Sequence, residues 1–314
     1  MDKQEQERKA SEAKELKKTE NGLISKSVKG ILCIITSAFC FSLMSLFIRL
    51  SGDVPVIQKC FFRNAVALII AASAMLKSHQ PFRIGKGNLK YLLCRAIGGT
   101  LGMVMNFYAV DHLAISDASI LNKLSPFFAI IFSAFILKEV ANKYEWLAVL
   151  VAFLGALFVV KPSFNVEVIP ALAGVLGGCG AGFAYTYVRK LGQRGENGMM
   201  IVLFFSAFST LCTLPWLLFH FTPMSVKQWI YLWLTGAAAA GGQVFITKAY
   251  TYAPAKEISV YDFSNVIFAA IWGMLFLEQM PDKFSIMGYV IIIGTAVVKW
   301  YHSIHKPSRA EQSL

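Results

Sequence analysis

The chain has 314 residues, of which 56% are hydrophobic and 15% charged, and its mean hydropathy is +0.56. A soluble domain of this length needs more charged and polar residues to cover its surface, so the composition excludes an ordinary soluble fold. The formal net charge of +12 could indicate a nucleic-acid-binding protein. Most basic residues, however, lie in the N-terminal tail and in short joints between apolar segments, which is the pattern of cytoplasmic loops. We therefore expect a lipid bilayer as the surroundings and no nucleic-acid partner.

Residues 1–27 are rich in lysine, glutamate, glutamine and serine, and they predict a disordered basic tail. Apolar segments then follow one another. A membrane-spanning helix needs about 20 mostly apolar residues. Ten segments meet this need: 28–49, 56–76, 91–110, 116–137, 144–161, 169–189, 198–219, 228–251, 257–277 and 284–301. They are too long and too uniformly apolar for barrel strands, so the sequence predicts an all-α integral membrane protein with ten transmembrane helices.

The joints between these helices predict the orientation. If the N-terminus is cytoplasmic, the inner joints carry lysine and arginine in groups, whereas the outer joints carry them singly. Ten crossings return residues 303–314 to the cytoplasm as a second basic tail. The first apolar run begins only near Val28 and is long enough to span, so no cleavable signal peptide is indicated. These patterns favour a multi-pass protein of the plasma or inner membrane.

The second half of the chain repeats the first. "LSPFFAIIFSAFILKE" (124–139) aligns with "FSNVIFAAIWGMLFLE" (263–278), and "GALFVVK" (155–161) aligns with "GTAVVK" (294–299). Each copy, expected over 28–162 and 168–302, holds an odd number of helices, so the second copy enters the membrane from the opposite side. Inverted repeats of this kind build secondary transporters, with the substrate site where the halves meet. The alternative is a duplication that serves packing alone.

The same residues resemble the drug/metabolite transporter superfamily, and specifically its EamA-type branch. The matching features are a Ser-Pro pair in the fourth helix, glutamates that end the fourth and ninth helices, glycines in the fifth and tenth, and an arginine early in the second: Ser125, Pro126, Glu139, Glu278, Gly155, Gly288, Gly294 and Arg63. The resemblance implies two five-helix repeats, transport rather than catalysis, and efflux rather than uptake. Asn265 stands where the family often has a proline or small residue, so a kink is not implied in the ninth helix.

Lys123 and Asp262 are charged residues within apolar segments, at equivalent positions of the two repeats. Each lies roughly 10 Å from the start of its helix, and the helices start from opposite sides. In a hydrocarbon core of about 30 Å this leaves the two staggered by roughly 10 Å, so a direct ion pair needs an extended lysine, a tilted helix or a bridging group. Two interpretations stay open: the charges fix the repeats together, or they bind a polar solute or take part in proton coupling.

Other polar side chains near this pair are expected to line a substrate cavity. The candidates beside Lys123 and Asp262 are Asn122, Tyr261, Asn106, Ser119, Ser259, Asn265, Gln243 and Arg63. Arg63 is interpreted either as a ligand of an anionic group or as a partner of a helix end. Arg95 and Lys248 lie near the inner helix ends and are expected to extend to the membrane surface. Pro126 leaves a carbonyl near Asn122 without its amide partner, which predicts a hinge in the fourth helix.

The sequence contains no GxxxxGK[ST], HExxH or GxSxG motif, and its six cysteines show no ligand spacing. We therefore expect neither an enzyme nor an ATP-driven pump, and no metal or cofactor, with proton coupling left open. The predicted function is secondary active transport of a small polar organic metabolite, amino-acid-like or zwitterionic, as a monomer or homodimer. One alternative is a nucleotide-sugar or phosphorylated-metabolite exchanger, which needs several arginines or lysines converging in the cavity, and the sequence offers few. The other is a membrane scaffold that transports nothing.

Overall fold

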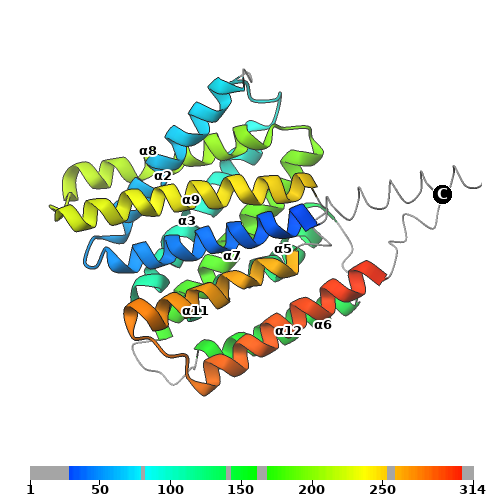
Figure 1. Cartoon of the computed structure of the whole chain (residues 1–314). Coiled ribbons are helices and arrows are strands. Elements are labelled where there is room, and N and C mark those ends of the chain that lie inside the picture. The colour runs from blue at the N-terminus through cyan, green and yellow to red at the C-terminus, as the bar shows by residue number, and fades with distance from the viewer. Residues whose placement is uncertain (1–27, 79–81, 139–142, 161–167, 253–258, 306–314) are drawn as a thin grey trace, which may run out of the picture.

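The computed structural model of the chain describes residues 28–78, 82–138, 143–160, 168–252 and 259–305, and every regular element within these ranges is helical. The helices form one bundle (Figure 1). Their bounds are Val28–Leu50 for the N-terminal helix, Val56–Lys77 (α2), Leu89–His112 (α3), Ile115–Asn122 (α4), Ser125–Ile136 (α5), Lys143–Val160 (α6), Val168–Gln193 (α7), Gly198–His220 (α8), Val226–Tyr252 (α9), Ser259–Phe263 (the 3-10 helix η1), Ser264–Leu277 (α11) and Lys283–His305 (α12). The tail predicted for 1–27 and the fourth-helix glutamate Glu139 lie outside the described residues.

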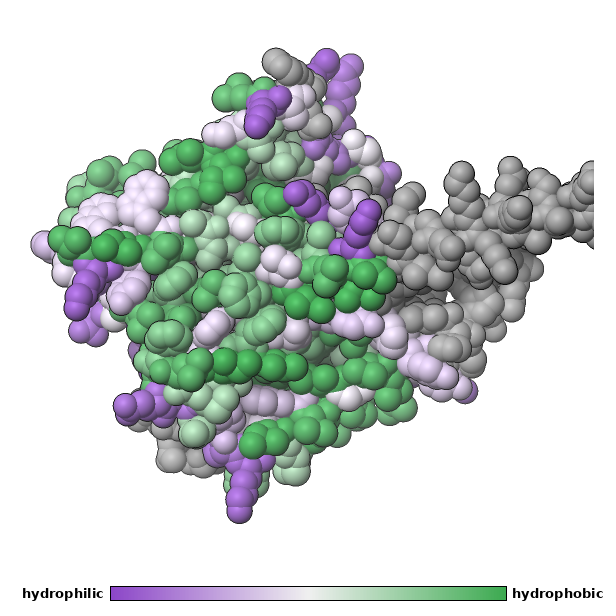
Figure 2. Space-filling model, in the orientation of Figure 1, coloured by the Kyte–Doolittle hydropathy of each residue, from purple (hydrophilic) through white to green (hydrophobic). Residues whose placement is uncertain are grey.

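The predicted membrane fold is confirmed. Across the described ranges, nine helices are long and apolar enough to cross a membrane, and α6 adds a shorter apolar stretch, Trp146–Val159. Hydrophobic residues cover most of the visible face, and hydrophilic residues gather toward its edges (Figure 2). An exposed apolar surface of this extent suits lipid, because helices satisfy their own backbone hydrogen bonds there. The chain is a multi-pass membrane protein.

Equivalent helices of the two repeats lie against each other. The second helices, α2 and α8, are in contact, and so are the fifth helices, α6 and α12. The fourth and ninth spans meet through α4 and α11. Elements near a two-fold axis must contact their own counterparts, so these pairs fit the predicted inverted repeats. The start of the N-terminal helix and the end of α12 lie at the same end of the bundle, here called the termini end (Figure 1).

Glycines let α3 and α7 approach closely. A Cβ atom added to Gly180 of α7 would lie 2.6 Å from Gly102 Cα and 2.8 Å from Gly98 O of α3. Both neighbours are backbone atoms and cannot rotate away. The two helices therefore have to separate to accept any side chain at Gly180.

Replacing Gly180 by alanine is expected to lower the free energy of unfolding by about 1–3 kcal/mol, because overpacking a close helix contact forces backbone shifts. Gly192→Ala is the matched control, since Gly192 lies on the same helix and a Cβ there meets nothing within 4 Å. Thermal unfolding of the purified variants in one detergent compares the two. Equal stability of the two variants would contradict the close-contact explanation.

The fourth transmembrane span is interrupted at the predicted hinge. Helix α4 ends at Asn122, and α5 begins at Ser125 with Pro126 in its first turn. Proline has no backbone N–H, so Pro126 cannot donate the helical hydrogen bond to Asn122 O. At the break, Leu124 N donates to Leu121 O at 3.1 Å, which is the tighter pattern of a 3-10 turn. Motion at this break stays a prediction.

The ninth span changes at the equivalent level without a proline. The 3-10 helix η1 gives way to α11 between Phe263 and Ser264, and Ser264 Oγ donates to Tyr261 O at 2.7 Å. The sequence did not predict this interruption, because Asn265 lacks the features that break a helix. Both repeats thus carry an irregular turn beside their intramembrane charge.

Candidate functional site

Lys123 and Asp262 form a direct ion pair between the two repeats. Lys123 Nζ lies 2.5 Å from Asp262 Oδ2, and the side chains are 13% and 24% exposed. Lys123 is the residue that caps the C-terminus of α4, and Asp262 lies in η1. No bridging group is needed, so the expected stagger does not keep the charged ends apart. The structure therefore contains the ion pair of the first interpretation, and the binding of a solute or a proton stays a prediction.

The pair leaves one carboxylate oxygen without a partner. Asp262 Oδ1 is buried and makes no hydrogen bond among the described residues. A buried carboxylate oxygen normally has a donor, because desolvation without a hydrogen bond is costly. This oxygen is therefore a free acceptor for a proton or for a polar solute.

Several predicted cavity residues make structural contacts around the pair. Asn265 Nδ2 donates to Ala38 O of the N-terminal helix at 2.9 Å. Tyr261 packs against Ile34 and Ala249. Ser119 accepts the backbone N–H of Lys123 through its carbonyl oxygen at 3.1 Å.

A cavity of about 190 Å³ lies between α2, α3, α8 and α9. These are the second and third helices of each repeat, so the cavity is built from equivalent elements of both halves. Its lining residues are Arg63, Ala67, Ile70, Ala71, Ala74, Arg95, Gly198, Met199, Val202, Phe205, Ser206, Ala239, Ala240, Gln243, Val244 and Lys248. Arg63 and Gln243 are thus the predicted residues that line it. The remaining candidates, Lys123, Asp262, Asn122, Tyr261, Asn106, Ser119 and Asn265, are not among its lining, and the side chain of Ser259 lies outside the described residues.

Two arginines from different helices face one aromatic ring in this cavity. The guanidinium carbon of Arg95 lies 4.0 Å from the centroid of Phe205, and that of Arg63 lies 5.8 Å from it. Arg63 Nη1 also donates to Asn64 Oδ1 at 2.8 Å. Neither arginine forms an ion pair with a described carboxylate.

The expectation that Arg95 extends to the membrane surface is wrong, because Arg95 lines the cavity, whereas Lys248 lines the cavity and is also exposed near the end of α9. For Arg95 the cause is Gly99, one turn further along α3. A Cβ atom at Gly99 would overlap Arg95 Nη1, so the glycine lets the guanidinium lie along the helix toward the middle of the bundle. A glycine four residues after an intramembrane arginine was the signal that the sequence offered.

The end of the bundle opposite the termini end is held by polar contacts that sequence reasoning missed. Lys59 is fully buried, and its Nζ lies 2.6 and 2.7 Å from the two carboxylate oxygens of Asp111 and 2.9 Å from Gly52 O. Gln58 exchanges two hydrogen bonds of 3.0 Å with the backbone of Thr222 in the second repeat. We call Gln58, Lys59, Asp111 and Thr222 the polar tie.

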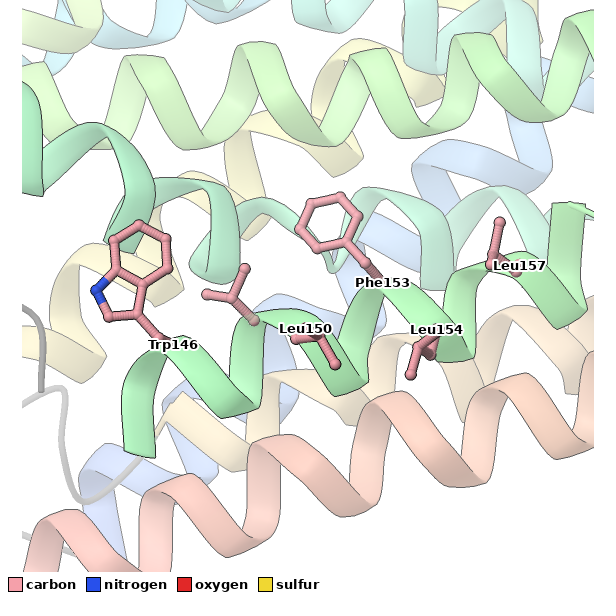
Figure 3. Close-up of a pocket in the computed structure, with 6 residues that line it drawn as sticks. Trp146, Leu150, Phe153, Leu154 and Leu157 are labelled. Carbon is pink, nitrogen blue, oxygen red and sulfur yellow. The ribbon is translucent and has the colours of Figure 1, made fainter. Parts of the chain in front are cut away.

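A larger hollow of about 540 Å³ is a lipid-facing feature. It is lined by Trp146, Val149, Leu150, Phe153, Leu154 and Leu157. All six come from one helix, α6 (Figure 3). Apolar side chains without convergent polar groups do not make a solute site. Among the described residues no three His, Cys, Asp or Glu side chains gather as metal ligands.

Comparison with known proteins agrees with this architecture. The model of the EamA-like transporter family matches residues 28–161 and again 168–300. The pseudopaline exporter CntI of Pseudomonas aeruginosa is 33% identical over 271 residues, which cover 85% of this chain and 94% of the relative. Solute carrier family 35 member G1 of Homo sapiens is 24% identical over 87% of this chain and 80% of its own length.

A crystal structure of a protein that is 16% identical superposes with a TM-score of 0.60, covering 87% of this chain and 97% of the other. That likeness supports the fold. The two family matches and the exporter together confirm the predicted transporter family, whose members are not enzymes. The chain belongs to the EamA-like transporter family, within the drug/metabolite transporter superfamily.

Proposed function

We propose that this protein is a secondary active exporter of a small polar organic solute, amino-acid-like or zwitterionic, in the cell membrane. The observation that carries the proposal is the cavity between α2 and α3 of one repeat and α8 and α9 of the other. A site built from equivalent helices of two inverted repeats can be opened to either side by rocking one repeat against the other. Alternating access is the mechanism that this arrangement supports.

The shape of the site supports export. The polar tie closes the end opposite the termini end, whereas the cavity lining reaches Ala74, Gly198 and Lys248, near the ends of α2, α8 and α9 on the termini side. Basic joints and tails favour the cytoplasm for the termini end. A solute then enters from the cytoplasm. The activity named for the Pseudomonas aeruginosa relative, export of pseudopaline, supports the same direction.

The size of the cavity favours a metabolite. Pockets for drug-sized ligands measure roughly 300–1,000 Å³, and this cavity of about 190 Å³ is smaller. Proton coupling would use Asp262, whose free buried oxygen can accept a proton. A proton gradient then supplies the energy for transport without a bound cofactor.

A second candidate is an exchanger of phosphorylated metabolites or nucleotide sugars. The sequence offered few basic residues for such a cavity. The structure corrects that expectation, because Arg63, Arg95 and Lys248 all line it. Arginine binds phosphate as well as carboxylate through paired N–H groups.

Purified protein in liposomes tests both candidates. Counterflow is measured with a panel that contains pseudopaline, amino acids, sugar phosphates and a nucleotide sugar, with and without an imposed pH gradient. We expect an amino-acid-like solute to exchange and to accumulate when the gradient is applied. A preference for sugar phosphates or nucleotide sugars selects the second candidate. If no solute of the panel moves, the scaffold alternative replaces transport.

A further inference from the structure

Three of the residues that line the cavity carry a buried polar atom without a hydrogen-bond partner. These atoms are Arg63 Nε, Arg95 Nε and Ser206 Oγ, and none has a hydrogen bond among the described residues. They come from α2, α3 and α8, so no single local distortion explains them. Buried polar atoms in folded proteins are nearly always paired, and a shared cavity is where an absent partner would bind.

The positive charges in the cavity have no negative charges beside them in its lining. The cavity lining contains two arginines and a lysine and no aspartate or glutamate. The stacking of the guanidinium groups on Phe205 contributes about 0.5–2 kcal/mol each. The cost of removing each charge from water is several kcal/mol. The aromatic ring therefore does not offset the cost of burying these charges, whereas a bound anion does.

The geometry selects the kind of anion. A guanidinium group presents parallel N–H donors that match the two oxygens of a carboxylate or a phosphate. Arg63 and Arg95 approach Phe205 from different helices, and each keeps an Nε–H without a partner, while Arg63 Nη1 already donates to Asn64 Oδ1. The hydroxyl of Ser206 adds one further hydrogen bond. Lys248 is exposed and lies near the end of α9, where it attracts an approaching anion.

We infer that the transported solute carries at least two anionic groups, and that Arg63 and Arg95 bind them together. This inference rests on the proposed function and narrows it from a neutral zwitterion to an acidic metabolite. Carboxylate and phosphate share the chemistry that the two arginines recognise. The two sources are separated by the test.

The test measures binding to the purified full-length protein by thermal stabilisation, using pairs of acidic and neutral probes. Glutamate is compared with glutamine, and O-phosphoserine with serine. A ligand that binds only the folded state stabilises it in proportion to the logarithm of its concentration over its Kd. We expect the acids to bind at least about tenfold more tightly than their neutral partners, the effect of one charge-assisted hydrogen-bond set. Tighter binding of O-phosphoserine than of glutamate identifies phosphate, and the reverse identifies carboxylate.

Variants of the cavity residues show which side chains bind the acidic probes. Arg63→Gln and Arg95→Gln are each expected to remove the preference for acids, and Arg95→Lys to retain part of it, because lysine keeps the charge and loses the paired donors. Arg83→Gln is the matched control: Arg83 is an exposed arginine in the α2–α3 joint and does not line the cavity. It should bind the acids as the original protein does. If a glutamine variant does not fold, Arg63→Lys and Arg95→Lys replace it, and each is expected to lower the preference for acids without removing it.

The inference is overturned if acids bind no more tightly than their amides, or if Arg83→Gln lowers the preference as much as the cavity variants. The proposed function fails differently, by the absence of counterflow for every solute in the liposome panel. Transport of neutral zwitterions that is unchanged in Arg63→Gln and Arg95→Gln would leave the proposed function intact and refute this inference alone.

Discussion

Asp111→Asn is expected to lower the free energy of unfolding by about 3–5 kcal/mol, because it leaves a buried lysine without its counter-charge. Lys59 is 0% exposed, and both carboxylate oxygens of Asp111 lie within 2.7 Å of its Nζ. Among the described residues, the carbonyl of Gly52 is the only other acceptor for this ammonium group, at 2.9 Å. One neutral acceptor does not replace a carboxylate. Thermal unfolding in detergent measures the loss.

Asp53→Asn is the control for Asp111→Asn. Asp53 lies in the joint between the N-terminal helix and α2 and is exposed. An exposed charge contributes about 0–1 kcal/mol. The double variant Lys59→Met/Asp111→Leu removes both charges and should recover most of the stability, since apolar replacements of a buried pair are often neutral. If Asp111→Asn proves no less stable than Asp53→Asn, Lys59 is not held by its carboxylate partner.

The spans could be predicted from the sequence because each depends on local properties. A run such as 198–219 is apolar throughout, and the helix Gly198–His220 follows from length and hydropathy alone. The missing backbone N–H of Pro126 likewise predicts a break in the fourth span. The ninth span shows the limit. Its change from η1 to α11 lies between Phe263 and Ser264, and the segment contains no proline that would predict it.

The cavity could be predicted only in part, because its residues come from four helices. The sequence predicts Arg63 and Gln243 as cavity residues, and both line the cavity. It places Arg95 at the surface, because depth along a helix does not say which way a long side chain turns. Asp111 was missed because a carboxylate at the end of a span usually faces water. Its partner Lys59 is far away in sequence, and only the packing of α2 against α3 brings them together.

Lys123→Met is expected to lower the rate of gradient-driven transport at least about tenfold, which corresponds to an activation barrier higher by about 1.4 kcal/mol or more. The pair joins the broken fourth span of one repeat to the irregular ninth span of the other. Any motion of one repeat against the other must therefore strain or break it. Because both side chains keep some contact with solvent, the expected loss of stability is smaller, about 1–3 kcal/mol.

Stability and transport can be separated at this pair. The double variant Lys123→Met/Asp262→Leu removes both charges and is expected to regain stability, because no unpaired charge remains. If the pair only fastens the repeats, transport returns with stability. We expect it not to return, because the free oxygen of Asp262 is lost together with the carboxylate. Proton flux and solute flux measured together in liposomes decide the matter: solute transport by the double variant at the original rate would show that the two charges serve the fold alone.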